Sequence, residues 1–283
     1  MNAAAPVLRS PHGKPMLPDM NDSVLLAREG PVATLTLNRP AALNVLDLAM
    51  VDALVALTAE VAADRSLRVL VVRGAGRHFM AGGDIRTFAQ SLGRTPDERG
   101  REFAHLLERV HTAVETLALM PQPVVACVHG AVAGFGLSLM NACDLAIASD
   151  DAYFAAAYRQ LAVTPDGGGT WSLPRIVGQR RALEIMLLGE RFDAARALAI
   201  GLVNRVVPAG ELGAAVDAMV RSIVEGPRDA LAGTKRLLRR SFDRALPEQL
   251  AAEAASFSGL TMDDDFVEGV SAFLEKRPPR FRD

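Results

Sequence analysis

The sequence predicts an α/β fold, because short β-branched runs alternate with helical patterns from Val24 onward. Two apolar runs, 69–72 and 124–128, are each followed by a glycine-rich turn and then by a helical pattern. Such turns present backbone N–H groups at or near a helix start, where negatively charged oxygen binds well. The two turns therefore resemble two halves of one site for an anion.

The composition limits the possible functions. The chain has 31 Lys and Arg residues against 33 Asp and Glu residues, and half of its 283 residues are hydrophobic. It lacks the roughly 18 consecutive apolar residues of a membrane span, so we expect a soluble protein without membrane partners. A net charge of −2 gives no general attraction to nucleic acid. Cys127 and Cys143 lie in apolar stretches and should be reduced and buried, as in a cytoplasmic protein.

The chain divides into three parts in this prediction. Residues 1–22 contain several prolines and no continuous apolar stretch, so we expect a mobile N-terminal arm. Residues 23–207 carry the strands and should form the core. Residues 208–283 are helical only, with too few helices to bury their own apolar faces, so we expect them to cover a neighbouring subunit.

The elements of the core follow from local patterns. A strand is expected over 32–37, followed by a helix that Asp47 caps. The polar stretch 91–101 should be a mobile loop before a long helix that ends at about Leu119, ahead of two prolines. The remaining expected strands are 145–148, 153–154 and 202–207, and the remaining core helices are 182–188 and 194–200.

Five segments together resemble the crotonase superfamily of enoyl-CoA hydratases and isomerases. They are Leu-Asn-Arg-Pro at 37–40, Gly-Arg-His-Phe-Met-Ala-Gly-Gly-Asp-Ile at 76–85, the glycine cluster 130–136, and the segments 142–148 and 165–170. The resemblance runs from about Val24 to the C-terminus. It implies a crotonase-like spiral of ββα units, with C-terminal helices that assemble homotrimers, often paired into hexamers. It also implies an acyl-CoA thioester substrate, so coenzyme A enters with the substrate and no separate cofactor is expected.

The resemblance assigns an oxyanion hole to the two glycine turns. Enzymes of this family hold the thioester oxygen on two backbone N–H groups while it becomes an enolate. The matching residues here are Gly83 and Phe135, and Ala81 is placed in the substrate pocket. Phe135 stands where glycine is common, yet its backbone donor remains. Asp84 and Asp144 are expected to be structural, Asp84 as a helix cap.

The positions of the two hydratase glutamates are occupied by other residues. Hydration needs two acid/base groups, and the hydratases of the family use two glutamates for this. This chain has Ser138 and Tyr158 at the matching positions, so both are assigned to the substrate pocket. Neither side chain is a good base at neutral pH. Ordinary hydratase activity is therefore not expected.

Asp166 is the expected catalytic base. Some family members that shift double bonds, among them enoyl-CoA isomerases and the ring-opening isomerase of phenylacetyl-CoA breakdown, carry a carboxylate at this point. One carboxylate can remove a proton from one carbon and return it to another while the hole holds the dienolate. The alternative is that Asp166 forms a turn or caps a helix before three glycines.

Coenzyme A is expected to contact the C-terminal end of the chain and a basic residue near the first glycine turn. Phe273 and Lys276 match the family's ending, where an aromatic residue and a lysine of a neighbouring subunit approach the nucleotide; alternatively, this basic end is only solvated. Many relatives have a lysine at the position of Ala41, so Arg39 or Arg77 should supply the missing positive charge.

Other titratable residues carry weaker hypotheses. Glu108, His111 and Glu115 share a helical spacing and are expected mainly at the surface. His78 and His129 have no partner at ligand spacing, so no metal site is expected.

The leading hypothesis for the whole chain is an acyl-CoA isomerase that shifts a double bond through an enolate. One alternative is an enoyl-CoA hydratase or another thioester-enolate enzyme of the family with an unrecognised base. The other alternative is a catalytically silent acyl-CoA-binding scaffold.

Overall fold

A computed structural model of the chain describes residues 22–282. Its main sheet has six strands in the order β1-β2-β3-β4-β6-β9. The strands are β1 (Val24–Glu29), β2 (Val32–Leu37), β3 (Val69–Gly74), β4 (Val124–Val128), β6 (Leu145–Ser149) and β9 (Arg205–Val207). All neighbours pair in parallel except β1, which is antiparallel to β2. The arm predicted over 1–22 lies, apart from its last residue, outside the described residues.

A second, smaller sheet has β7 (Tyr153–Ala155) at its centre. This strand pairs in parallel with β5 (Ala131–Ala133) and antiparallel with β8 (Phe192–Asp193). The second glycine-rich segment therefore contains a short strand, β5, and is not a simple turn. Strand β4 of the main sheet ends just before this segment, and β5 within it belongs to the smaller sheet, so both sheets fix its position in the fold.

Eleven α-helices occur between residues 22 and 282. They are α1 (Leu48–Ala63), α2 (Ile85–Gln90), α3 (Pro96–Leu119), α4 (Phe135–Ala142), α5 (Gly169–Val177), α6 (Gln179–Leu188), α7 (Ala194–Ala199), α8 (Leu212–Val224), α9 (Arg228–Arg239), α10 (Leu246–Leu260) and α11 (Asp264–Leu274). Asp47 caps α1 as predicted, because its side chain accepts the N–H of Met50 at 2.9 Å. Across these described residues, no helix combines the length and the apolar character needed to cross a bilayer.

Two of the predicted boundaries were wrong. Helix α3 begins at Pro96, inside the stretch 91–101 that was expected to be a loop. Thr95 and Glu98 form a capping box: Glu98 accepts the N–H of Thr95 at 3.0 Å, and Thr95 accepts the N–H of Glu98 at 3.3 Å. This cap and a proline at the first helical position outweigh the polar composition. The last strand covers only Arg205–Val207 of the predicted 202–207.

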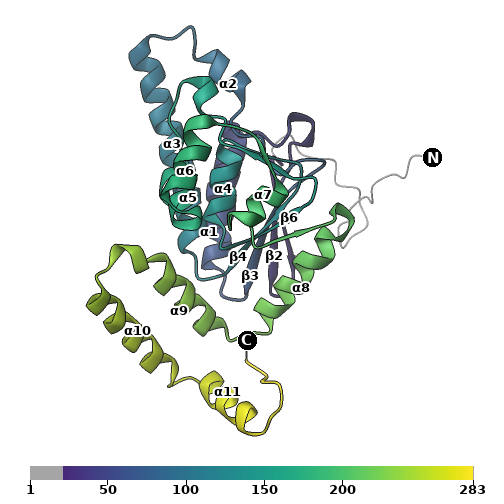
Figure 1. Cartoon of the computed structure of the whole chain (residues 1–283), viewed down its shortest axis with the longest axis vertical. Helices are drawn as coiled ribbons and strands as arrows, with labels where there is room; N and C mark the ends of the chain where they lie inside the picture. The colour runs from purple at the N-terminus through teal and green to yellow at the C-terminus, as the bar shows by residue number, and fades with distance from the viewer. Residues whose placement is uncertain (1–21, 283) are drawn as a thin grey trace, which may run out of the picture.

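The main sheet is covered on both faces. Alternate residues of β3 point to opposite sides, so Leu70 joins the core under α1 and α3 while Val71 joins a second core under α8. Figure 1 shows α8 on the opposite side of the sheet from α1. A parallel sheet buried on both faces explains why its strands are apolar throughout and do not alternate.

Helices α9 to α11 extend away from the α/β part (Figure 1). Helix α8 packs on the sheet, so only the segment after it, in the region 208–283, leaves the core. This extension carries many exposed apolar side chains. Those at least 67% exposed are Leu238, Phe242, Leu246, Phe257, Met262, Phe273 and Leu274.

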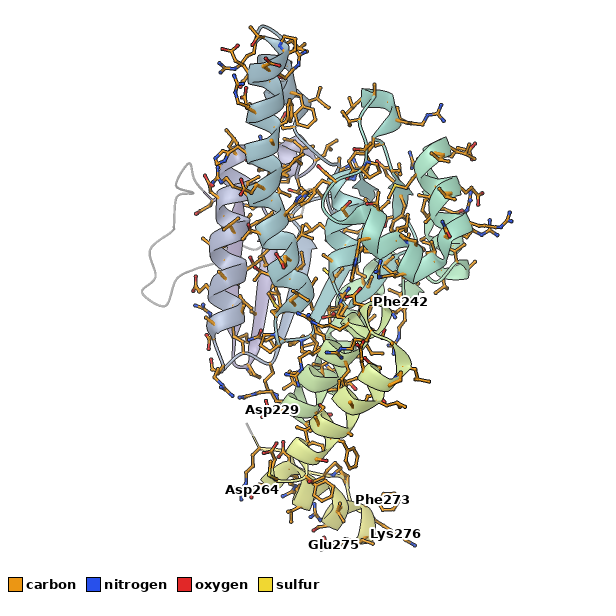
Figure 2. All side chains as sticks on the ribbon, turned by 90° about the vertical axis from the view of Figure 1, so that its left-hand side faces the viewer. Asp229, Phe242, Asp264, Phe273, Glu275 and Lys276 are labelled. Atoms are coloured by element: carbon orange, nitrogen blue, oxygen red, sulfur yellow. The ribbon has the colours of Figure 1, made fainter. Side chains whose placement is uncertain are left out.

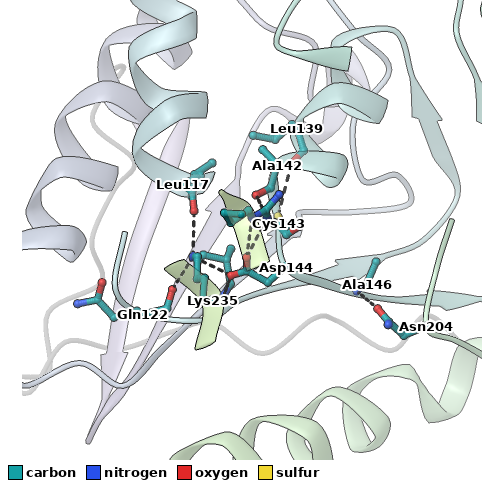
Figure 3. Close-up of polar contacts among 11 residues, drawn as sticks. Leu117, Gln122, Leu139, Ala142, Cys143, Asp144, Ala146, Asn204 and Lys235 are labelled. Carbon is teal, nitrogen blue, oxygen red and sulfur yellow. Dashed lines mark hydrogen bonds and ion pairs between the residues drawn. The ribbon is translucent and has the colours of Figure 1, made fainter. Parts of the chain in front are cut away.

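A buried ionic cluster fastens α9 to the α/β part (Figure 3). Lys235 Nζ lies 2.7 Å from Asp144 and donates to the carbonyl oxygens of Leu117 at 3.3 Å and Gln122 at 2.9 Å. Arg239 donates to the second oxygen of Asp144 at 2.8 Å. Asp144 therefore has the structural role that the sequence predicted.

Candidate active site

The two glycine-rich segments lie against each other. The N–H of Met80 donates to Ala131 O at 3.0 Å, and the N–H of Ala133 donates to Met80 O at 2.9 Å. Next to this contact, a Cβ on Gly134 would lie 3.4 Å from the Cα of Gly82. Both glycines have positive φ, 98° at Gly82 and 52° at Gly134. The close approach and the backbone conformation therefore both favour glycine here.

The two predicted donors, Gly83 and Phe135, flank this contact. The N–H of Leu46 donates to Gly82 O and that of Asp84 donates to Leu46 O, which leaves the N–H of Gly83 unused. Phe135 begins α4, and the first N–H groups of a helix have no partner within it. Between residues 22 and 282, neither N–H donates a hydrogen bond to another residue. A Cβ on Gly82 would lie 3.7 Å from the Phe135 nitrogen, so the two turns bring these amides close together.

An aromatic side chain lies beside the residue of the first donor. A Cβ at Gly83 would lie 2.8 Å from the ring of Phe88, so this ring of α2 lies directly over the glycine. Phe88 meets Phe103 of α3 edge to face, with 5.0 Å between the ring centroids. Ala81, predicted for the substrate pocket, is half-buried and donates its N–H to Leu43 O at 3.1 Å. The amide of Gly83 therefore has an apolar wall beside it.

Asp84 caps α2, as predicted, by accepting the N–H of Arg86 at 3.0 Å. It also pairs with Arg39 at 3.0 Å, and Arg39 lies 3.2 Å from Asp47 and donates to Val45 O at 2.6 Å. In this chain the guanidinium of Arg39 therefore binds the two carboxylates that cap α1 and α2. Its role toward coenzyme A stays a prediction.

The two residues at the hydratase glutamate positions both contact Asp166. Tyr158 donates from Oη to Asp166 Oδ1 at 2.6 Å. Ser138 donates from Oγ to the main-chain oxygen of Asp166 at 2.8 Å, and the two hydroxyl oxygens are 3.2 Å apart. Ser138 is 1% exposed and Tyr158 is 8% exposed, while Asp166 is half-buried. The fold thus brings three of the predicted site residues together.

The carboxylate of Asp166 does not cap the helix that follows. Helix α5 has Gly168 at its N-cap position, and no side chain accepts a hydrogen bond from the first turn. The N–H of Gly169 donates to the main-chain oxygen of Asp166, at 3.0 Å, and not to its side chain. The alternative that Asp166 is a helix cap was therefore wrong.

Burial controls the charge of this cluster. It raises the pKa of the Asp166 carboxyl above its ordinary value, and the hydrogen bond from Tyr158 and the nearby His111 oppose that rise only in part. Burial and the adjacent Asp166 raise the pKa of Tyr158, so the phenol keeps its proton at neutral pH and acts as a donor. A carboxylate in this environment binds a proton more readily than an exposed aspartate.

The segment that carries Asp166 lies against the helix that carries the second donor. A Cβ at Gly167 would lie 2.7 Å from the Phe135 ring and 3.0 Å from the Cβ of Ser138. Gly167 has a φ of 57°, so glycine is also favoured by the backbone. Asp166 is therefore next to a residue in direct contact with Phe135.

His111 was named from the sequence only as a weak candidate expected mainly at the surface; it is exposed, yet it contacts the Asp166 segment. It comes from α3, and its Nε2 accepts the N–H of Gly167 at 3.3 Å. The signal was present as helical spacing: Val114, three residues later, lies 3.8 Å from the place of a Cβ on Gly168. This spacing puts both side chains on the side of α3 that faces the Asp166 segment.

His78 and His129 use their rings within the fold. His78 Nδ1 accepts the N–H of Ala131 at 3.0 Å, and His129 Nε2 lies 3.1 Å from Gly76 O. Phe273 and Lys276, predicted for coenzyme A, lie at the tip of the C-terminal extension, away from the α/β part (Figure 2). Phe273 is 84% exposed. Within one chain these two residues are therefore not part of the Asp166 cluster.

Comparisons with known proteins identify the family of the chain. A sequence model described as enoyl-CoA hydratase/isomerase matches residues 27–283. A probable enoyl-CoA hydratase of Rhodobacter capsulatus is 36% identical over 250 residues, covering 88% of this chain and 94% of that protein. The 1,2-epoxyphenylacetyl-CoA isomerase of Escherichia coli is 35% identical over 264 residues, covering 93% of this chain and 99% of that protein.

The fold is similar to that of a solved structure. The crystal structure of an enoyl-CoA hydratase from Mycobacterium smegmatis superposes with a TM-score of 0.84 at 36% identity, covering 91% of this chain and 98% of that one. The predicted crotonase-like fold with C-terminal helices is therefore confirmed. The similar proteins include both hydratases and isomerases, so similarity alone does not choose between the two reactions.

Proposed function

Because the chain belongs to the enoyl-CoA hydratase/isomerase family, we propose that it is an acyl-CoA isomerase that shifts a double bond through an enolate. The thioester oxygen accepts hydrogen bonds from the N–H groups of Gly83 and Phe135. Asp166 is the single base that moves the proton. Coenzyme A arrives as part of the substrate, and neither a separate cofactor nor a metal takes part.

The proposed reaction is a proton transfer between two carbons. With a 3-enoyl thioester, the Asp166 carboxylate removes a proton from the carbon next to the carbonyl. The electrons of that C–H bond form a dienolate, whose negative oxygen is held by the two amides. Asp166, now protonated, returns the proton to the fourth carbon, and the double bond moves next to the carbonyl. Atoms and charge balance without water.

The observation that carries this proposal is the Ser138–Tyr158–Asp166 cluster. Ser138 and Tyr158 stand at the two positions where a hydratase would have glutamates, and the hydroxyl groups of both donate hydrogen bonds to Asp166. One carboxylate suits an isomerase, because the same group can accept and return the proton. Burial, which raises its pKa, brings its proton affinity closer to what a reversible acid/base needs at neutral pH.

We further propose that the chain works as a homotrimer or hexamer in the cytoplasm. Exposed apolar side chains on α9 to α11 need a partner surface, and a second copy of the chain would bury them. In such an assembly, Phe273 and Lys276 of one subunit would approach coenzyme A bound to another, with Arg39 near its phosphates. The buried free thiols of Cys127 and Cys143 suit a reducing compartment.

The test is to incubate the protein with 3-enoyl-CoA and with 2-enoyl-CoA in heavy water. We expect the double bond to move and solvent deuterium to enter the acyl chain, with no added hydroxyl group. Mass spectrometry distinguishes the isomer from the hydrate by the mass of one water.

Two other outcomes favour the alternatives. A 3-hydroxyacyl-CoA product would mean an enoyl-CoA hydratase that uses a different base, and the isomerase proposal would fall. Tight binding of both thioesters without exchange or turnover would mean a catalytically silent acyl-CoA-binding scaffold. Titration calorimetry with the same thioesters measures that binding separately from turnover.

A further inference from the structure

We propose that Tyr158 is a positioning residue that holds one oxygen of the Asp166 carboxylate and leaves the other free for proton transfer. This inference rests on the isomerase proposal and assigns to Tyr158 a role in orienting the base. The residue does not itself exchange a proton with the substrate.

The hydrogen-bond pattern assigns different functions to the hydroxyl groups of Tyr158 and Ser138. Each hydroxyl carries one proton. The Tyr158 proton has two possible acceptors, Asp166 Oδ1 at 2.6 Å and Ser138 Oγ at 3.2 Å, and the shorter, charged acceptor gives the stronger bond. The Ser138 proton reaches the main-chain oxygen of Asp166 at 2.8 Å. Tyr158 therefore fixes the carboxylate, and Ser138 fixes the backbone that carries it.

The second carboxylate oxygen remains available. Among residues 22–282, no other residue donates a hydrogen bond to Asp166 Oδ2. An aspartate side chain with one oxygen held cannot rotate freely, so Oδ2 keeps a defined direction. A base that is already oriented loses less entropy when it reaches the reactive geometry.

The loop that carries Tyr158 is itself held in place. Ala157, the preceding residue, has a φ of 59°, which is unfavourable for a residue with a Cβ and persists only where surrounding contacts fix the backbone. The next residue, Arg159, donates to the carbonyl oxygens of Leu187 at 3.1 Å and Leu188 at 2.7 Å. These two oxygens are at the end of α6, so the loop is tied to a helix and Tyr158 is a fixed donor.

Three groups from three parts of the fold face Asp166. They are Tyr158 on its loop, Ser138 on α4 and His111 on α3. The hydrogen bond from Tyr158 lowers the pKa of Asp166 against the effect of burial. Replacing Tyr158 by phenylalanine removes that bond and keeps the ring, His111 and Ser138. The pKa of Asp166 should then rise.

The first experiment compares Tyr158→Phe with Ser138→Ala. Because the base must be ionised, the low-pH side of the kcat/KM profile follows the pKa of Asp166. Tyr158→Phe should move that side to higher pH and lower kcat by up to about 100-fold, since the carboxylate is no longer oriented. Ser138→Ala should leave the low-pH side near its wild-type position, because its bond goes to the backbone oxygen.

The second experiment needs no turnover. Carboxyl carbon NMR of protein labelled with ¹³Cγ-aspartate follows the titration of Asp166 directly, and Asp166→Asn identifies its signal. We expect Asp166 to titrate at higher pH in Tyr158→Phe than in the wild type. Circular dichroism at each pH confirms that both variants are folded.

The outcomes separate this inference from the proposed function. If the wild type shifts the double bond but Tyr158→Phe leaves both the profile and the titration unmoved, the positioning role is overturned and the isomerase proposal stands. If the wild type shows no isomerisation or exchange, the proposed function itself is overturned. A shift to higher pH in both measurements supports the positioning role.

Discussion

Two aspartates, Asp144 and Asp166, are held in opposite ways. Asp144 pairs with Lys235 and Arg239 and accepts the N–H of Val124 at 2.8 Å. Asp166 is bound by a hydroxyl and has no ion pair with Lys, Arg or His within residues 22–282. Both are half-buried, but only Asp144 is paired with cations among the described residues.

The difference between these two environments shows how nearby charges decide whether an aspartate has a structural or a catalytic role. A carboxylate that pairs with two cations of another helix ties two parts of the chain together, so it suits a structural joint. A carboxylate that burial favours in its protonated form can accept and release a proton, so it suits catalysis. The same residue type thus has a different role in each place, and the same substitution at the two sites should have opposite effects.

The largest effect on stability is expected for Asp144→Asn. The change leaves the buried cation Lys235 and the half-buried cation Arg239 without their counter-charge. We expect the free energy of unfolding to fall by about 3–5 kcal/mol, measured by urea denaturation. Asp217→Asn, on the exposed face of α8, is the matched control and should change stability by less than about 0.5 kcal/mol. Equal stabilities for both variants would show that the cluster does not hold α9 to the core.

A smaller loss is expected for Lys235→Met, which keeps the chain length and removes the charge. Asp144 then retains Arg239 and the N–H of Val124, so its charge stays partly compensated. We expect a loss of about 1.5–3 kcal/mol, the usual range for hydrogen bonds to charged groups. If the free energy of unfolding fell more in Lys235→Met than in Asp144→Asn, the main contribution would come from the hydrogen bonds of Lys235 to Leu117 and Gln122.

The smallest effect, with the opposite sign, is expected for Asp166→Asn. The folded state raises the pKa of this carboxyl, so ionisation at neutral pH disfavours folding. An uncharged amide removes that penalty, and we expect a small gain in the free energy of unfolding at pH 7. The gain should shrink as the pH falls and vanish below the ordinary pKa of 3.8, where the carboxyl is protonated in both states. A loss of stability at pH 7 would contradict this environment.

Much of the fold could be predicted from local patterns in the sequence. Apolar β-branched runs became the central strands, and Asp47 and Asp84 cap helices because their side chains act within three residues. The polar composition of 91–101 predicts a loop, but Thr95, Pro96 and Glu98 form a capping box, and this local cap sets the start of α3.

The contacts of the site could not be predicted in the same way. The family resemblance named Ser138, Tyr158 and Asp166 separately, but their hydrogen bonds join three elements and leave no periodic signal in the sequence. Lys235 is similar: a lysine on a helix predicts exposure, and its burial depends on an aspartate 91 positions earlier (235 − 144 = 91). Such pairs follow from tertiary packing, which single-sequence patterns do not encode.

The exchange of substrate protons with solvent deuterium shows most directly whether Asp166 is the base. The rate of solvent deuterium entry into 3-enoyl-CoA should fall by about 10²- to 10⁴-fold in Asp166→Asn, while the thioester binds as tightly as before. Asp217→Asn should keep the wild-type rate. Unchanged deuterium entry in Asp166→Asn, with the variant folded and the thioester bound, would contradict the account.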